Sequence, residues 1–278
     1  MKFLVLLLIV AIEKLSSWRR RVQLDRPWLH QLRQLERRPA APVRAWWIIL
    51  VLVGAPIALV GMLLSLAQPV AYGLLALPIH VAVLLFSLGR GGVNTGLGPF
   101  KDACRRADLD GAYLVARRDL GVEAATPEAL AVGVQRRFMY HAFEGFFAVV
   151  FWYVLLGPVV ALAYRLNALL VQHAVAPELR ERAVQIQHGL DWFPARVLAL
   201  TFGLVGDFVA LNRSLLGRLL DWDVQAADLV VETARSAAEV SAPSLDEEGN
   251  ANLDALWQLI VRSAVFWYVV FALWVVFV

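Results

Sequence analysis

The sequence is poor in the residues that make disulfide-bonded and zinc-binding proteins. It contains one cysteine, Cys104, which excludes an intramolecular disulfide framework and a cluster of thiolates within the chain. The five histidines show no metal-ligand spacing, so we predict no metal site. Cys104 is predicted to be a small residue on a helix.

The motifs of common phosphate-binding and hydrolytic enzymes are also missing. The glycine-rich stretch GRGGVNTGLGP at 89–99 lacks the Gly-Lys-Ser/Thr ending of a P-loop and follows an apolar run. It is therefore predicted to be a flexible turn. The sequence contains no nucleophile elbow or other hydrolase signature, so we predict no catalytic residue.

Long uncharged runs are present instead. Apolar residues make up 60% of the chain, and they gather in runs typical of transmembrane helices. The predicted spans are residues 1–12, 45–66, 70–88 and 263–278. The first run is also compatible with a cleaved signal peptide, but no Ala-x-Ala site follows it, which favours an uncleaved segment.

Basic residues indicate how these segments are oriented. Residues 13–44 contain nine lysines and arginines and residues 89–145 contain eight, whereas the link at 67–69 contains none. By the positive-inside rule, both basic segments lie in the cytoplasm and the link lies outside. Residues 212–262 are assigned to the cytoplasm as well. We attribute the basic balance to orientation and to contacts with anionic lipid, and we predict no nucleic-acid partner.

Two further apolar segments are predicted to be broken or re-entrant. Residues 146–164 are interrupted by Gly157-Pro158, which favours a kinked span or a hairpin. Residues 197–211 would reach only about 22 Å as a helix, short of a hydrocarbon core of about 30 Å. The chain is therefore predicted to be a single all-α, polytopic membrane domain over residues 1–278, with re-entrant or broken helices and a cytoplasmic helical layer.

Local signals define that cytoplasmic layer. Two short helices are expected around a turn near 108–111, ending at Gly121. A third helix is expected after Thr126, which suits an N-cap, and Pro127, which suits the first helical position. By composition, residues 240–252 are predicted to be a flexible linker.

Polar side chains gather at the predicted membrane face. At helical spacing, His141 and Glu144 share one face with Arg137 and Tyr140. Arginines near the ends of broken segments suit oxyanions, because the guanidinium fork binds carboxylate or phosphate in a bidentate manner. The predicted ligand pocket contains Glu13, His141, Glu144, Arg165, Asn167, Asp191 and Arg196.

Simpler structural roles for these residues stay open. In the first of these roles, Glu144 forms an ion pair with Arg137 or His141 at the membrane interface. In the second, Asp191 forms an ion pair with Arg196 that holds a loop at the bilayer. Glu13, beside Lys14, is then an interfacial acid.

The ordered motifs within residues 97–211 resemble the CobD/CbiB superfamily of membrane proteins. These motifs are Glu-Gly, Phe-Trp, Gly-Pro, Tyr-Arg-Leu-Asn and Pro-Ala-Arg. Chain length, the start LLLIVAIEKL and the spelling LDWFPAR resemble most closely the AmpE branch. That resemblance implies a multi-pass protein of the bacterial inner membrane that is associated with β-lactamase induction and the response to cell-wall stress.

The sequence departs from the enzymatic branch of that superfamily, which joins an aminopropanol derivative to a corrinoid carboxylate using ATP. Residues 140–145 contain one acid, and Gln187, His188 and Asp191 stand where that branch has an acidic pair and an asparagine. The acids that would hold Mg-ATP are thus partly missing. This favours a binding protein without a cofactor over an enzyme.

The leading interpretation is a signalling modulator that binds an anionic small molecule, such as a nucleotide or muropeptide, at the cytoplasmic membrane face. Its expected partners are the lipid bilayer and either another protein or a second copy of the chain. One alternative is an ATP-dependent enzyme that forms amide bonds and uses Mg-ATP. Another alternative, suggested by the broken segments, is a transporter or lipid-handling protein.

Overall fold

The computed structural model describes Val5, Leu8 and residues 25–36, 42–67, 75–88, 97–207 and 219–277. Every regular element in these ranges is a helix, which confirms the all-α fold class. Apart from Val5 and Leu8, the predicted span at 1–12 lies outside the described residues.

The chain divides into two compact units. Unit 1 comprises Met1–Arg90 and Ala148–Asp191, and unit 2 comprises Gly91–Phe147 and Trp192–Val278. The units interleave along the sequence, since each is assembled from two separate stretches of the chain.

Three helical stretches are long and apolar enough to cross a membrane. They are Ala45–Ala67, Pro127–Leu156 and Glu247–Trp274. Large apolar side chains on them are exposed, including Leu66 at 62% and Trp274 at 64%. Such surfaces are unfavourable in water and favourable in lipid, so the protein is a membrane protein.

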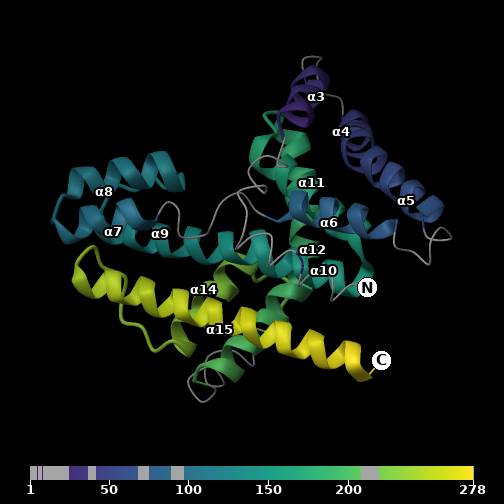
Figure 1. Ribbon diagram of the computed structural model, residues 1–278. Helices are drawn as coiled ribbons and strands as arrows, with labels where there is room; N and C mark the ends of the chain where they lie inside the picture. Colours follow the sequence, from purple (N-terminus) through teal and green to yellow (C-terminus); the bar gives the residue numbers. More distant parts are fainter. Residues whose placement is uncertain are drawn as a thin grey trace. The chain divides into compact units, whose positions relative to one another are not determined.

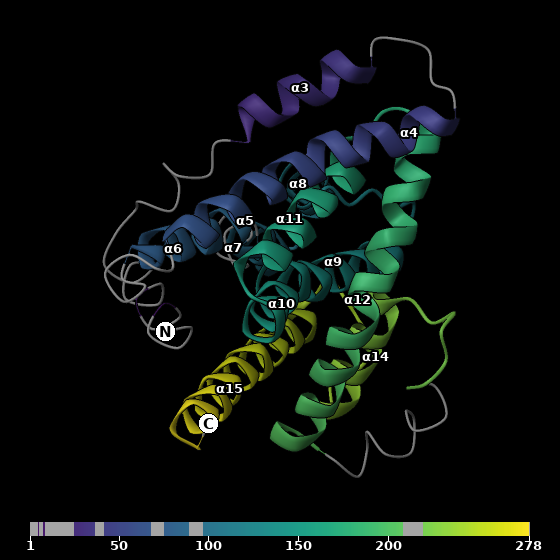
Figure 2. The ribbon, with the colours of Figure 1, turned by 90° about the vertical axis from the view of Figure 1, so that its right-hand side faces the viewer.

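Unit 1 is built around α11. Its helices are α3 (Arg26–Glu36), α4 (Pro42–Ile49), the π-helix η1 (Leu50–Gly54), α5 (Ala55–Ala67), α6 (Ala76–Ser87), α10 (Ala148–Leu156), α11 (Pro158–His173) and the first part of α12 (Pro177–Val205). The helix α11 packs against α5, α6, α10 and η1 (Figures 1 and 2). Its side chains therefore supply much of the core of this unit.

The predicted break at Gly157-Pro158 is confirmed. Gly157 has φ 91°, a value that favours glycine, and Pro158 is the first residue of α11. Helices α10 and α11 then pack against each other as a hairpin. The chain reverses at Gly157 instead of continuing as one kinked helix.

The second broken segment differs from its prediction. A separate half-helix beginning near residue 197 is wrong, because α12 is one helix of 29 residues with Pro194 inside it. Proline removes the hydrogen bond to the carbonyl four residues earlier, that of Leu190. The Trp152 indole donates to this carbonyl at 3.1 Å and so satisfies it.

The apolar helix α6 is shorter than its predicted span. It has 12 residues, about 18 Å of helix, and residues 70–74 of the predicted span lie outside the described part of the chain. The placement of this segment across the membrane stays a prediction.

Unit 2 contains the helices predicted for the cytoplasmic layer and also segments predicted to lie in the membrane, in α12 and α15. Its helices are α7 (Leu97–Arg105), α8 (Leu109–Val115), the π-helix η3 (Ala116–Leu120), α9 (Pro127–Ala142), the π-helix η4 (Phe143–Phe147), the rest of α12, α14 (Ala226–Ala237) and α15 (Glu247–Phe277). Thr126 caps α9 by accepting the Ala129 N–H at 3.2 Å, as expected. Helix α9 packs against α14 and α15 (Figure 1).

The linker predicted at 240–252 is wrong from residue 247 onward. Asp246 Oδ1 accepts the Gly249 N–H at 2.8 Å, which begins α15 at Glu247. Composition alone missed this helix start because the acids that make a segment look flexible also suit a first helical turn.

The end of α7 provides a stability prediction. Ala107 has φ 54°, and the Asp108 N–H donates to the Ala103 carbonyl at 3.0 Å, as in a Schellman motif that usually has glycine. Ala107→Gly should raise the free energy of unfolding by about 0.5–1 kcal/mol, because glycine has no Cβ to strain. Thermal unfolding in detergent would measure this change. Ala251→Gly, at an exposed helical position, should lower stability instead; a loss in both variants would contradict the prediction.

Candidate functional site

A buried chain of hydrogen bonds joins α11 to α12 within unit 1. Asp191 Oδ1 accepts from Tyr164 Oη at 2.6 Å and from Gln187 Nε2 at 3.0 Å. Asn167 Nδ2 donates to Gln187 Oε1 at 2.9 Å and to the Ala183 carbonyl at 3.0 Å. We call Tyr164, Asn167, Gln187 and Asp191 the Asp191 network. All four are almost fully buried.

Helical spacing explains how the network assembles. Tyr164 and Asn167 are three residues apart on α11, and Gln187 and Asp191 are four residues apart on α12, so each pair shares a helix face. Sequence reasoning missed Tyr164 and Gln187 as site residues. Their spacing from Asn167 and Asp191 is the signal that would have identified them.

One acceptor of the network is unsatisfied. Within the part of the chain that the structure describes, Asn167 Oδ1 is buried and has no hydrogen-bond partner. A buried carbonyl oxygen without a donor costs about 1–3 kcal/mol. The network therefore retains a polar atom that a further N–H or O–H donor would stabilise.

Arg165 lies between Tyr164 and Asn167 on α11 and faces a second carboxylate. Its Nη2 is 3.6 Å from Asp25 Oδ2, and both side chains are buried, at 7% and 1% exposure. This separation exceeds the roughly 2.7–2.9 Å of a strong charge-assisted hydrogen bond. Asp25 was not among the predicted site residues; it directly precedes α3, and its backbone carbonyl accepts the Leu29 N–H.

Helix α3 is held in unit 1 at both ends. Beyond the Asp25 contact at its start, Glu36 Oε1 at its end accepts the backbone N–H groups of Val175 and Ala176, at 2.9 and 3.1 Å. These groups precede α12, so Glu36 supplies acceptors where that helix begins. The two ends of α3 therefore contact α11 and the start of α12, the two helices that carry the Asp191 network.

Arg196, in unit 2, binds backbone carbonyls. Its Nε, Nη1 and Nη2 donate to the carbonyls of Leu219, Trp192 and Asp221 at 2.9, 3.0 and 2.6 Å. Its guanidinium also lies 4.4 Å from the Trp192 ring centroid. Burial lowers the pKa of Arg196, and nearby Asp221 opposes that shift. These contacts fix the segment at 219–222.

Arg196→Lys should release this segment. A lysine ammonium is a point charge and cannot donate to three separated carbonyls, so the expected cost is roughly 2–3 kcal/mol. Faster amide hydrogen exchange at residues 219–223 would report the release. Arg182→Lys, which alters an exposed cation–π contact with Trp46, should leave that exchange unchanged. Unchanged protection in Arg196→Lys would contradict this role.

The predicted pair of His141 and Glu144 lies at a helix irregularity in unit 2. His141 is near the end of α9, and Glu144 is buried in the π-helix η4. Single π-helical turns within α-helices frequently occur at functional sites.

The structure brings together only part of the predicted pocket. Asn167 and Asp191 meet through Gln187 in unit 1, whereas Arg165, in the same unit, contacts Asp25. His141, Glu144 and Arg196 belong to unit 2, and Glu13 lies outside the described residues. A single pocket made by all seven residues stays a prediction.

The expected position of this pocket at helix ends is wrong. Arg165 and Asn167 lie inside α11, and Asp191 and Arg196 lie inside α12. None of these four residues therefore lies at a half-helix terminus.

The chain was compared with known protein families, curated proteins and solved structures. Residues 1–240 match the family model described as regulatory signalling modulator protein AmpE. No curated protein and no solved structure matches the chain. The matched range contains both helices of the Asp191 network, as well as Asp25, Glu144 and Arg196. The chain therefore belongs to the AmpE family of regulatory signalling modulator proteins.

Proposed function

We propose that the protein is a signalling modulator of the bacterial inner membrane, linked to β-lactamase induction and cell-wall stress, which binds an anionic small molecule. Membership of a family of regulatory signalling modulators supports the signalling role, and three candidate spans support the membrane location. The sequence resemblance described above supports the link to β-lactamase.

The observation that carries ligand binding is the buried polar group of unit 1. Burying charged side chains costs several kcal/mol per ion, which an apolar core would avoid. Arg165 provides a planar fork suited to carboxylate or phosphate, and its contact with Asp25 is long, at 3.6 Å. On the same helix, Asn167 Oδ1 is a buried acceptor that has no hydrogen-bond partner among the described residues. An oxyanion suits Arg165, and an N–H or O–H donor suits Asn167.

Competition for Arg165 provides a route from binding to signalling. A ligand oxyanion that binds Arg165 weakens its ion pair with Asp25, at the start of α3. Helix α3 then keeps its contacts through Trp28 and Glu36 but loses one of its attachments. A ligand shifts such an equilibrium only by its differential affinity for the two arrangements, which competition supplies. With its N-terminal contact to Arg165 lost, α3 is then available to bind a protein partner.

Direct binding tests this proposal. Full-length protein in detergent would be screened with Mg-ATP, UDP-linked muropeptides and anhydro-muropeptides, by equilibrium dialysis and thermal shift. One class should bind saturably, with about 2.7 kcal/mol of stabilisation at a concentration 100 times Kd. Arg165→Lys should weaken binding, whereas Arg180→Lys, exposed on α12 of the same unit, should not.

Three outcomes would overturn the proposal. The first is the absence of saturable binding by any of these ligands. The second is an equal loss of binding in the Arg180→Lys control. The third is turnover of ATP by the purified protein that Glu144→Gln abolishes, which would favour the enzymatic alternative. Complementation of a deletion strain, with β-lactamase induction as the readout, tests the physiological link separately.

A further inference from the structure

A polar cavity lies within unit 2, between α9 and α14. Its volume is about 430 Å³, which is within the usual range of small-molecule sites. Arg136 reaches it from α9 and Arg235 reaches it from α14. Val132, Val231 and Val240 contribute apolar surface to the lining. The cavity thus combines two guanidinium groups with an apolar wall.

The two arginines differ in how well their donors are satisfied. Arg136 Nη2 lies 3.0 Å from Asp228 Oδ1 and 3.4 Å from Gln225 Oε1, so its charge is balanced. Arg235 makes one long hydrogen bond, from Nη2 to the Ser241 carbonyl at 3.5 Å. Its Nε is buried and has no hydrogen-bond partner among the described residues.

The donor capacity of Arg235 therefore exceeds what the protein supplies. A guanidinium has five N–H groups in a fixed fork that matches the geometry of a carboxylate or phosphate. A half-buried guanidinium with one weak acceptor gains most from an oxyanion, because charge-assisted hydrogen bonds are about twice as strong as neutral ones.

We propose that this cavity binds a small organic oxyanion, whose charged group accepts hydrogen bonds from Arg235 and whose apolar body lies on the three valines. The site lies in unit 2 and shares no residue with the Arg165 site of unit 1, so it goes beyond the function proposed above. Failure of either proposal leaves the other intact.

The acidic side chains of the cavity limit the charge of the ligand. Asp228, which pairs with Arg136, and Glu232 both line the cavity with their carboxylates. Two carboxylates balance the two guanidinium groups, so a dianion would meet more repulsion than a monoanion. The preferred ligand is therefore singly charged, such as a carboxylate or a phosphodiester.

Arginine side-chain NMR tests this site with a defined probe. Protein labelled with [15N]arginine, in non-ionic detergent, would be titrated with benzoate, and with benzamide as the neutral analogue of similar shape. The Nε–H resonance of Arg235, assigned by its disappearance in Arg235→Lys, should shift saturably with benzoate alone. Equilibrium dialysis should show at least about tenfold weaker benzoate binding in Arg235→Lys, as expected for loss of a bidentate contact.

Controls separate this site from general ionic effects. Arg117→Lys, whose parent side chain pairs with Glu123 on the surface of the same unit, should bind benzoate as the unmodified protein does. Nanodiscs with phosphatidylglycerol in place of phosphatidylcholine test a lipid headgroup as the source of the oxyanion. A shift of the Arg235 resonance there supports the site and assigns the oxyanion to lipid.

Three results would overturn the proposal. The first is an Arg235 resonance that shifts neither with phosphatidylglycerol nor with benzoate up to about 10 mM. That benzoate concentration exceeds the Kd of weak specific binding. The second is an equal response to benzamide. The third is benzoate binding that Arg117→Lys weakens as much as Arg235→Lys does.

Discussion

Replacing Asp191 by alanine is expected to lower the free energy of unfolding by about 3–5 kcal/mol, the range for breaking a buried charged pair or network. Asp191 is 3% exposed and accepts hydrogen bonds from Tyr164 and Gln187. Alanine would leave both donors buried without their acceptor, and each such donor costs about 1–3 kcal/mol. Chemical unfolding of the full chain in detergent would measure the loss.

Two milder variants distinguish loss of the acceptor from loss of volume. Asp191→Asn keeps an oxygen at the same place, and Tyr164→Phe removes only one donor, so each should cost about 1–2 kcal/mol. A double-mutant cycle between Tyr164 and Asp191 should show a coupling of about 0.5–3 kcal/mol. Additive effects, or a cost below about 1 kcal/mol for Asp191→Ala, would show that the network does not stabilise the fold.

Local signals in the sequence predicted local structure well. The cap at Thr126 and the break at Gly157-Pro158 depend on backbone preferences that act within a few residues. Both features are therefore readable without knowledge of the tertiary structure. The same holds for the short helices around residues 108–111 and for the apolar span at 45–66.

Tertiary partners decided the features that were predicted wrongly. Pro194 favours a helix break by its own chemistry, yet α12 continues because Trp152, 38 residues away from Leu190, binds the carbonyl that the proline leaves without a donor. No pattern around residue 194 contains that information. The tertiary hydrogen bond from Trp152 to the Leu190 carbonyl thus outweighed the local preference of Pro194 for a helix break.

The candidate site shows the same division. Residue type and charge predicted Asn167 and Asp191 as pocket residues, because polar groups in an apolar chain need partners. Both make buried hydrogen bonds in the structure, and their role in ligand binding stays a prediction. The identity of those partners depended on helix packing, so Tyr164, Gln187 and Asp25 were not identified. The partners of Arg196 were not predictable either. Its three acceptors are backbone carbonyls, which every residue carries and which no sequence motif distinguishes.

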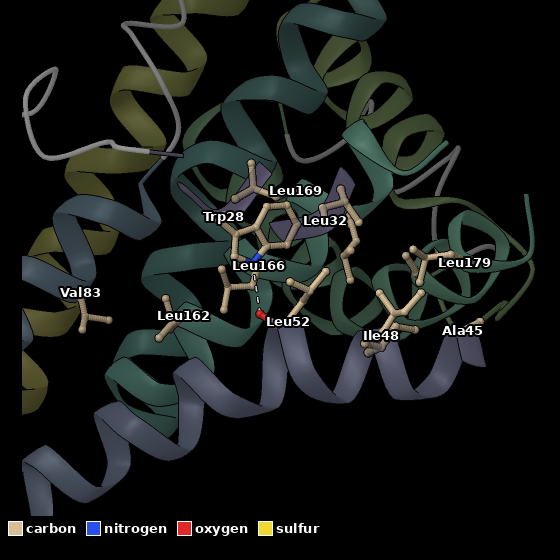
Figure 3. Close-up of a cluster of buried hydrophobic side chains, with 13 residues drawn as sticks. Trp28, Leu32, Ala45, Ile48, Leu52, Val83, Leu162, Leu166, Leu169 and Leu179 are labelled. Atoms are coloured by element: carbon tan, nitrogen blue, oxygen red, sulfur yellow. Dashed lines mark hydrogen bonds between the residues drawn. The ribbon is translucent and has the colours of Figure 1, made fainter. Parts of the chain in front are cut away.

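A π-helical turn within the span Ala45–Ala67 explains why α3 is attached where it is. The π-helix η1 departs from regular α-helical hydrogen bonding, and the Leu52 carbonyl within it accepts the Trp28 indole N–H at 3.1 Å (Figure 3). A carbonyl in an apolar environment needs such a donor. Trp28 is 8% exposed and belongs to the same buried cluster as Leu166 and Leu169 of α11. One side chain thus satisfies the backbone and fills the core.

Trp28→Ala should therefore lower the free energy of unfolding by about 3–5 kcal/mol, the usual cost of emptying a large aromatic site. Trp28→Phe keeps most of the packing but loses the N–H, so it should cost about 1–2 kcal/mol. Trp47→Ala is the matched control. Trp47 lies on α4, within the span Ala45–Ala67, and is 61% exposed, so its replacement should cost little stability in detergent. Chemical unfolding would rank the three variants. An equal loss for Trp28→Ala and Trp47→Ala would show that α3 is not anchored by this contact, and the route from Arg165 through α3 would then lose its structural basis.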